Sequence, residues 1–236
     1  MPALETFEAT ALWSAVTIGC YLVARAVARR WRFWWTSPLL LTPVMVGLVA
    51  LSLHARYADY IRGTHWLLLM LGPATVAFAI PIYEQRKVIR RYWPVLLLGV
   101  LVGSSIAMAA AFFMASWLDL SSTLQLSLMP RSTSTPFAMA VADDIGGLPD
   151  LTAVFVILTG VAGAALGEVM LKVMPLRSAL ARGALFGMGA HGAGVARAHQ
   201  IGGEEGSIAG LVMVLAGLFN VMMAPVVAYL DRKSVV

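Results

Sequence analysis

Eight stretches of mostly apolar residues follow one another along the chain, and each is long enough to cross a lipid bilayer as an α-helix. They lie near residues 9–28, 37–54, 66–83, 93–117, 123–142, 150–173, 183–199 and 206–230. A spanning helix needs about 20 such residues, and lipid excludes backbone that is not hydrogen-bonded internally. Only 12% of the 236 residues are charged, against about 25% in soluble domains. The sequence therefore predicts an all-α polytopic membrane protein with seven to eight membrane segments in a single domain, residues 1–236.

Basic residues predict how these segments are oriented. One cluster follows the first segment and a second cluster follows the third: Arg25, Arg29, Arg30 and Arg32, then Arg86, Lys87, Arg90 and Arg91. Both are expected in the cytoplasm, because short cytoplasmic loops carry an excess of Lys and Arg. The N-terminus, with Glu5 and Glu8, is then outside. Since the net charge of +5 comes mostly from such clusters, we expect no nucleic-acid partner.

Simple alternation of the later segments conflicts with this rule. It places Lys172, Arg177 and Arg182 outside, along with Arg232 and Lys233. The conflict disappears if residues 123–142 enter the membrane and return to the same side. We therefore expect a re-entrant segment there, with the acidic loop after it outside.

The expected re-entrant segment contains a cation and hydroxyl groups between Pro130 and Pro136: Arg131, Ser132, Thr133, Ser134 and Thr135. Proline breaks a helix, and irregular backbone at membrane depth lines a water-filled path or is buried by protein. A guanidinium binds a carboxylate through two parallel hydrogen bonds, and a helix that restarts near Pro136 directs free N–H groups to the same point. The pattern predicts a broken helix that binds an anion. The alternative is that Arg131 extends to the membrane surface.

Two other segments are interrupted by glycine. Gly72 and Thr75 lie in the third segment, and His191, Gly192 and Gly194 lie in the seventh, roughly 115 residues later. Paired interruptions of this kind indicate a transporter site between two inverted halves, here residues 9–117 and 123–230. The alternatives are that glycine and proline are simply common in membrane helices, and that the Thr75 hydroxyl bonds to its own backbone.

Further polar residues have two interpretations each. His191 either binds substrate and carries a coupled proton, or donates to a backbone carbonyl. Arg197 either binds substrate, or contacts lipid, Glu204 or Glu205. Asp143 and Asp144 are a countercharge for Arg131 or a solvated pair, and Glu168 pairs with Lys172 four residues later.

Glycine pairs at four-residue spacing favour close helix packing, within one chain or in a homo-oligomer: Gly99/Gly103, Gly163/Gly167, Gly183/Gly187 and Gly206/Gly210. The sequence has no nucleophile–base set, phosphate loop or paired-histidine metal motif, and its one cysteine, Cys20, excludes an intrachain disulfide. We expect no enzyme activity, no catalytic residue, no metal and no cofactor.

Together these motifs resemble the LrgB/CidB family of bacterial membrane proteins, which includes the C-terminal part of a plant chloroplast glycolate/glycerate translocator. The matching runs are residues 71–77, 80–83, 130–138, 146–149, 151–156, 159–160, 190–198 and 203–206. Arg131 and the His191-Gly192 pair fit the family pattern. The resemblance implies a multi-pass protein of the bacterial inner membrane.

The resemblance also implies two functions of different class. One is transport of a small carboxylate anion such as glycolate, glycerate, lactate or pyruvate. The other is a holin/antiholin-like role in murein hydrolase export and lysis, with a small LrgA/CidA-like membrane partner. The buried cation favours transport by alternating access, with substrate between the Arg131–Thr135 cluster, the Gly72–Thr75 break and the His191–Gly194 break, where Arg197 also contributes. Membrane lipid is the other expected partner.

Overall fold

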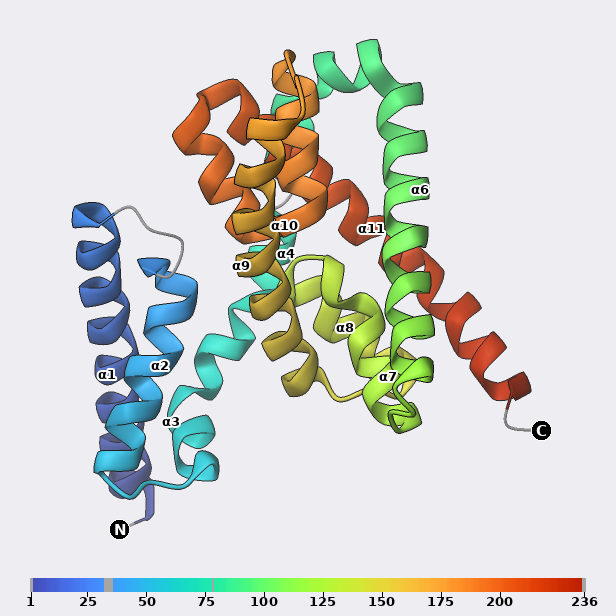
Figure 1. The fold of residues 1–236 in the computed structure, drawn as a ribbon. Helices are drawn as coiled ribbons and strands as arrows, with labels where there is room; N and C mark the ends of the chain where they lie inside the picture. Colours follow the sequence, from blue (N-terminus) through green and yellow to red (C-terminus); the bar gives the residue numbers. More distant parts are fainter. Residues whose placement is uncertain (1, 32–35, 78, 235–236) are drawn as a thin grey trace. The chain divides into compact units, whose positions relative to one another are not determined.

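The computed structural model describes residues 2–31, 36–77 and 79–234, and the regular structure in these ranges is entirely helical (Figure 1). Arg32, which belongs to the first basic cluster, lies outside the described residues. The chain divides into two compact units, Met1–Val76 and Ala77–Val236. The division into inverted halves at residues 9–117 and 123–230 stays a prediction.

The first unit contains α1 (Pro2–Arg30), α2 (Pro38–Ser52), α3 (Tyr57–Leu69) and most of α4 (Leu71–Ala77). The second unit contains α5 (Ala79–Glu84), α6 (Arg86–Trp117), α7 (Ser122–Leu128), the 3₁₀ turn η2 (Met129–Ser132), α8 (Thr135–Ile145), α9 (Pro149–Val173), α10 (Ala179–Ile201) and α11 (Gly203–Ser234).

Five helical stretches within the described ranges are long and apolar enough to cross a membrane: Glu8–Arg30, Tyr57–Glu84, Arg86–Trp117, Pro149–Val173 and Gly203–Tyr229. Several such helices in one chain make this a multi-pass membrane protein. The predicted segment at 37–54 is a shorter apolar helix, Pro38–Ser52. The stretch 123–142 is broken, as its prolines predict, whereas the continuous span expected at 183–199 is not observed because α10 is interrupted at His191.

In the first unit, α1 packs against α2 and α3. The rings of Trp13 and Tyr60 meet edge to face with their centroids 5.4 Å apart. The Trp66 indole donates to the Ser14 hydroxyl at 2.8 Å. Gly63 permits this approach, since a methyl group there would lie 2.8 Å from the Ala9 carbonyl oxygen.

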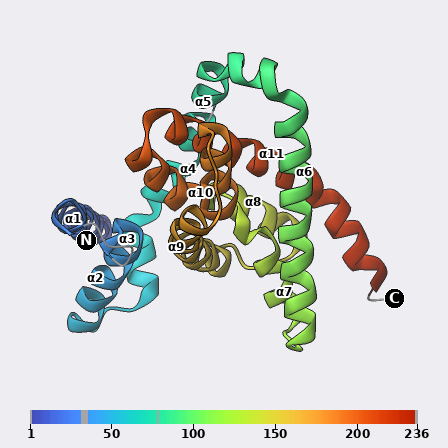
Figure 2. The same cartoon turned by 45° about the horizontal axis from the view of Figure 1, so that its top comes forward.

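In the second unit, α11 forms the centre. Ile208, Leu211 and Val214 on this helix are buried, and α5, α6, α8 and α10 all contact it. The neighbouring helices α9 and α10 lie side by side in both views (Figures 1 and 2). This helical packing positions both broken segments.

Candidate functional site: two broken helical hairpins

The first broken segment is α7–η2–α8. Helix α7 ends at Leu128, a single 3₁₀ turn covers Met129–Ser132, and Thr133 is extended before α8 begins at Thr135. Pro130 and Pro136 account for the break because neither has an N–H for an α-helical hydrogen bond. Both prolines lie in the first turn of the element that follows the break, where proline is tolerated. The break therefore occurs where the prolines predict it.

The two arms of this segment return to the same place. Helix α8 ends at Gly146, whose φ of 89° is left-handed, and a methyl group at Gly147 would lie 2.9 Å from the Ser127 nitrogen. The Leu148 N–H donates to the Ser127 hydroxyl at 2.8 Å, and the Thr152 hydroxyl donates to the Ser127 carbonyl at 2.9 Å. Residues 122–148 therefore form a helical hairpin with the break at its tip. We call this the first hairpin.

The second broken segment is α10. His191 has φ 37° and ψ −119°, which is not helical, and a methyl group at Gly194 would collide with the Phe186 carbonyl oxygen. Residues eight positions apart in a straight helix are separated by about 12 Å. The chain therefore reverses at His191, and residues 179–201 form what we call the second hairpin. This corrects the expectation of one continuous span at 183–199.

The two hairpins meet within the second unit. Turn η2 contacts α6, α8, α9 and α10. On α9, a methyl group at Gly160 would lie 2.7 Å from His191 Cε1, and one at Gly163 would collide with the Gly189 carbonyl oxygen. Because α9 also contacts η2, it packs against both breaks.

Buried polar atoms without a hydrogen-bond partner occur on both hairpins and on α6. Among the described residues they include Ser134 Oγ, His191 Nε2 and Ser104 Oγ, on residues that are 6%, 4% and 1% exposed. Leaving such a group unpaired costs about 1–3 kcal/mol. Ser134 precedes α8, yet its side chain does not cap the helix, so the first N–H groups of α8 also lack that partner. These groups can donate to, or accept from, a small polar ligand.

Arg131 lies on η2 and is partly buried. Within the ranges that the structure describes, its guanidinium forms no ion pair and no hydrogen bond with protein. Asp143 and Asp144 are exposed at the end of α8 and form no ion pair with it there. The remaining hydroxyl residues of the cluster are Ser132 and Thr135, which are partly buried, and Thr133, which is buried and donates to the Pro130 carbonyl at 3.1 Å.

The other predicted site residues are placed differently. Gly72 and Thr75 lie on α4 in the first unit, where the Thr75 hydroxyl donates to the Leu71 carbonyl at 2.8 Å, as its alternative interpretation describes. Gly192 is exposed beside His191, with open space around it. Roles for these residues in binding stay predictions.

Arg197 joins the second hairpin to α9. Its Nε lies 2.7 Å from Glu168 Oε1, and its Nη1 donates to Gln200 Oε1 at 2.5 Å. Glu168 thus pairs with Arg197 across two helices, in place of the expected Lys172. Glu205 pairs with Arg182 at 2.7 Å. Both ion pairs form because glycines bring α9 and α11 close to α10.

A family description, the LrgB-like family, matches residues 17–230. The chain belongs to the LrgB-like family. It is 43% identical over 211 residues to the uncharacterized protein YwbG of Bacillus subtilis (strain 168), covering 89% of this chain and 93% of that protein. It is 31% identical over 214 residues to the antiholin-like protein LrgB of the same organism, covering 90% of each. No solved structure matches the chain.

These matches confirm the family expected from the motifs. They also show that this LrgB-like chain is similar to its relatives over nearly their whole length. YxaC, a further uncharacterized protein of Bacillus subtilis (strain 168), is 32% identical over 215 residues, which are 91% of this chain and 94% of that protein.

Three residues of the candidate site at the two hairpins were not predicted from the sequence. Ser127 closes the first hairpin, Ser104 has an unpartnered buried hydroxyl, and Gly160 packs against His191. Ser104 interrupts a long apolar run, which was the available signal, whereas Ser127 lies among other polar residues and has no such signal. Gly160 lies about one helical turn before Gly163 on α9. It therefore extends the predicted packing pair Gly163/Gly167 toward the start of this helix.

Proposed function

We propose that this LrgB-like protein is a secondary transporter, or a subunit of one, for small monocarboxylates of the glycolate, glycerate, lactate and pyruvate class. The observation that carries the proposal is the contact between η2, which carries Arg131, and α10, which carries His191, with buried unpartnered polar atoms on both hairpins. Broken helices near the middle of the membrane form substrate sites in many transporters.

The chemistry of the site fits a small anion. The substrate carboxylate pairs with the Arg131 guanidinium, which offers two parallel donors. Ser132, Thr133, Ser134, Thr135 and the first N–H groups of α8 lie on the same break and favour negative charge. The hydroxyl or keto group of the substrate then reaches His191 Nε2. We further propose that His191 carries a proton coupled to transport.

The proposed membrane topology has eight segments in the bacterial inner membrane. Helices α1, α2, α3–α5, α6, α9 and α11 cross it, and the two hairpins are re-entrant. Lys172, Arg177 and Arg182 then lie inside, whereas the second re-entrant hairpin moves Arg232 and Lys233, which the sequence alone placed inside, to the outside. Since only α9 separates the hairpins, they open on opposite sides, which is the arrangement of an inverted repeat. Alternating access follows if movement of the hairpins exposes the site to each side in turn. A homo-oligomer or an LrgA/CidA-like partner is compatible with this arrangement.

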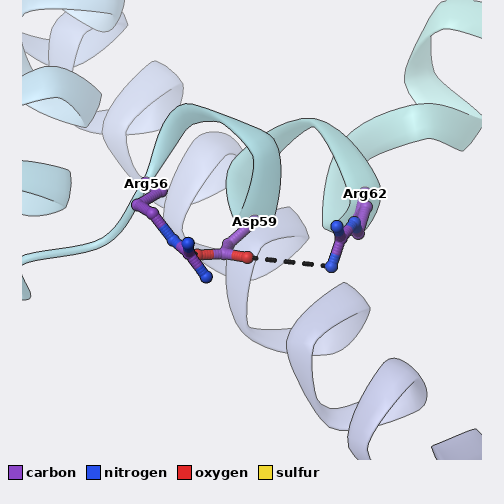
Figure 3. Close-up of polar contacts among 3 residues, drawn as sticks. All are labelled: Arg56, Asp59 and Arg62. Atoms are coloured by element: carbon purple, nitrogen blue, oxygen red, sulfur yellow. Dashed lines mark ion pairs between the residues drawn. The ribbon is translucent and has the colours of Figure 1, made fainter.

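The test is uptake of radiolabelled glycolate, lactate and pyruvate into proteoliposomes that contain this chain. The wild type is expected to show saturable uptake. Arg131→Ala is expected to reduce it roughly 10- to 100-fold, because a hydrogen bond to a charged group contributes about 1.5–3 kcal/mol. The matched control is Arg62→Ala on α3, where Arg62 is 77% exposed and 3.9 Å from Asp59 (Figure 3), and where ion pairs contribute little.

His191→Gln in the same assay tests proton coupling, because glutamine keeps a hydrogen-bonding side chain but does not titrate. Uptake should lose its dependence on a proton gradient. Equal uptake by wild type and Arg131→Ala would contradict the site. If no uptake occurs under any ion gradient, the assay is repeated with a co-reconstituted LrgA-like protein.

A second candidate function is regulation of lysis, favoured by 31% identity to the antiholin-like protein LrgB over 90% of both chains. A regulator acts through partner contacts and does not need the buried cation. Cells that carry Arg131→Ala would then keep the wild-type lysis phenotype, whereas a transporter whose activity drives the phenotype would lose it.

A further inference from the structure

An open pocket of about 370 Å³ lies where α5 meets α6, and neither Arg131 nor His191 lines it. It is lined by Ala79, Ile82, Tyr83, Arg86, Ile89 and Arg90. Its volume falls within the roughly 300–1,000 Å³ typical of small-ligand pockets. The lining is apolar apart from the two arginines and the tyrosine hydroxyl, so a ligand must combine an apolar part with an anionic part.

The two arginines stand on one face of α6. They are four residues apart, which places neighbouring side chains on the same side of a helix. The Arg86 guanidinium lies over the Tyr83 ring, 4.4 Å from its centroid, and donates to the Tyr83 carbonyl at 2.9 Å. These contacts hold Arg86 at the pocket while leaving other N–H groups free, since a guanidinium has five.

Arg86 and Arg90 form no ion pair in the described part of the chain, unlike four other arginines. Arg56 and Arg62 both lie near Asp59 (Figure 3), while Arg182 and Arg197 pair with glutamates. Lys87 and Arg91 add two more positive charges within the same turns of α6. Glu84 adds one negative charge two residues before Arg86, so the edge of the pocket keeps a net positive charge.

The packing of this region places the pocket at the surface of the bilayer. Ile82, Ile89 and Tyr92 pack against the buried Leu211 cluster of α11, which fixes the inner wall. Helix α6 bends at Tyr92, where φ is −119° and ψ is 18°. Beyond the bend the helix is apolar and exposes Val95 and Leu98, as a lipid-facing span does. Charged side chains are costly in the hydrocarbon, so the basic end of α6 is expected at the membrane surface.

We propose that this pocket is a specific binding site for an anionic phospholipid. The lipid phosphate binds Arg86 and Arg90, and the upper part of an acyl chain fills the apolar hollow between α5 and α6. Basic pockets on the cytoplasmic side of membrane helices suit anionic headgroups. A zwitterionic lipid lacks the net charge that the four cations attract.

The test uses the purified, delipidated full-length protein in detergent, titrated with phosphatidylglycerol or phosphatidylcholine and analysed by native mass spectrometry. Phosphatidylglycerol is expected to bind at least tenfold more tightly. The double variant Arg86→Ala/Arg90→Ala should lose roughly 30-fold in affinity, because each basic residue near an anionic surface contributes about 1 kcal/mol. Arg86→Lys/Arg90→Lys should retain most of the binding.

Two controls separate this site from general charge attraction. Arg29→Ala/Arg30→Ala removes two exposed cations of the other basic cluster, neither of which lines the pocket, and should leave the affinity for phosphatidylglycerol within about twofold. Ala79→Trp keeps every charge but fills the hollow, so it should weaken lipid binding. Equal binding of both lipids, equal loss in the two arginine pairs, or full competition by glycerol phosphate would each overturn the proposal.

Discussion

At the scale of the residue, His191 is the most unusual position in the second unit. Its φ of 37° and ψ of −119° suit glycine, and a side chain in such a conformation costs of order 1–3 kcal/mol. Its imidazole is buried, with Nε2 unpartnered. Glycine at position 191 would accept this turn without strain. The strained backbone therefore motivates a test of the histidine side chain.

This conformation predicts that His191→Gly is more stable than His191→Ala, which reverses the order of glycine and alanine in a regular helix. Both His191→Gly and His191→Ala remove the imidazole, so they differ only in backbone preference. The glycine variant should be more stable by about 1–2 kcal/mol, whereas alanine exceeds glycine by about 1 kcal/mol in a regular helix. Thermal unfolding in detergent measures the difference. A more stable alanine variant would mean that α10 is continuous at residue 191.

At the scale of the element, glycines fix how the second hairpin packs. A methyl group at Gly183 would lie 2.7 Å from the Glu205 carbonyl oxygen of α11, and one at Gly167 would lie 2.6 Å from the Phe186 ring. Gly194 lets the two arms of the hairpin approach each other. The pairs Gly163/Gly167 and Gly183/Gly187 thus pack helices within the chain, whereas Gly99 faces open space.

Two glycines on the arm that follows His191 should respond differently to an added methyl group. Gly194→Ala should destabilise the protein by about 1–3 kcal/mol because the backbone must shift to accept the methyl group. Gly192→Ala is the matched control, since nothing lies within 4 Å of a methyl group there, and its stability should change by less than about 1 kcal/mol. Chemical or thermal unfolding of both variants decides this. Equal losses would contradict the close approach of Gly194 and Phe186.

At the scale of the whole molecule, the two hairpins determine the topology. In the proposed topology each hairpin returns to the side of the membrane on which it starts, and α9 alone runs between them. The residues that flank one hairpin should therefore lie on the same side of the membrane. The residues that flank the other hairpin should lie on the opposite side.

Single cysteines test this topology in a Cys20→Ala background. A membrane-impermeant maleimide applied to intact cells should label Ser121→Cys and Leu148→Cys, which flank the first hairpin. Met174→Cys and Gly203→Cys flank the second hairpin and should be labelled only after permeabilisation. Labelling of residues 174 and 203 from opposite sides would mean that α10 crosses the membrane.

The positions of the broken helices follow from local chemistry, so the sequence predicts them well. Pro130 and Pro136 end and restart helices wherever the chain lies, and the glycines around His191 lower the cost of a turn. Basic clusters and apolar lengths similarly predict the helices α1, α6, α9 and α11. The reversal at His191 was missed because an apolar run of 17 residues has the same composition whether it crosses or returns.

The sequence by itself determined the membrane class, the family, the break around Arg131 and the residue types of the site. These depend on backbone hydrogen bonding and on the cost of charge in lipid, which are local properties. Only the tertiary structure decided that the hairpins meet at η2, that Arg197 pairs with Glu168, and that Ser127 closes the first hairpin. Each of these contacts joins residues far apart in the chain, so packing of α9, α10 and α11 selects them.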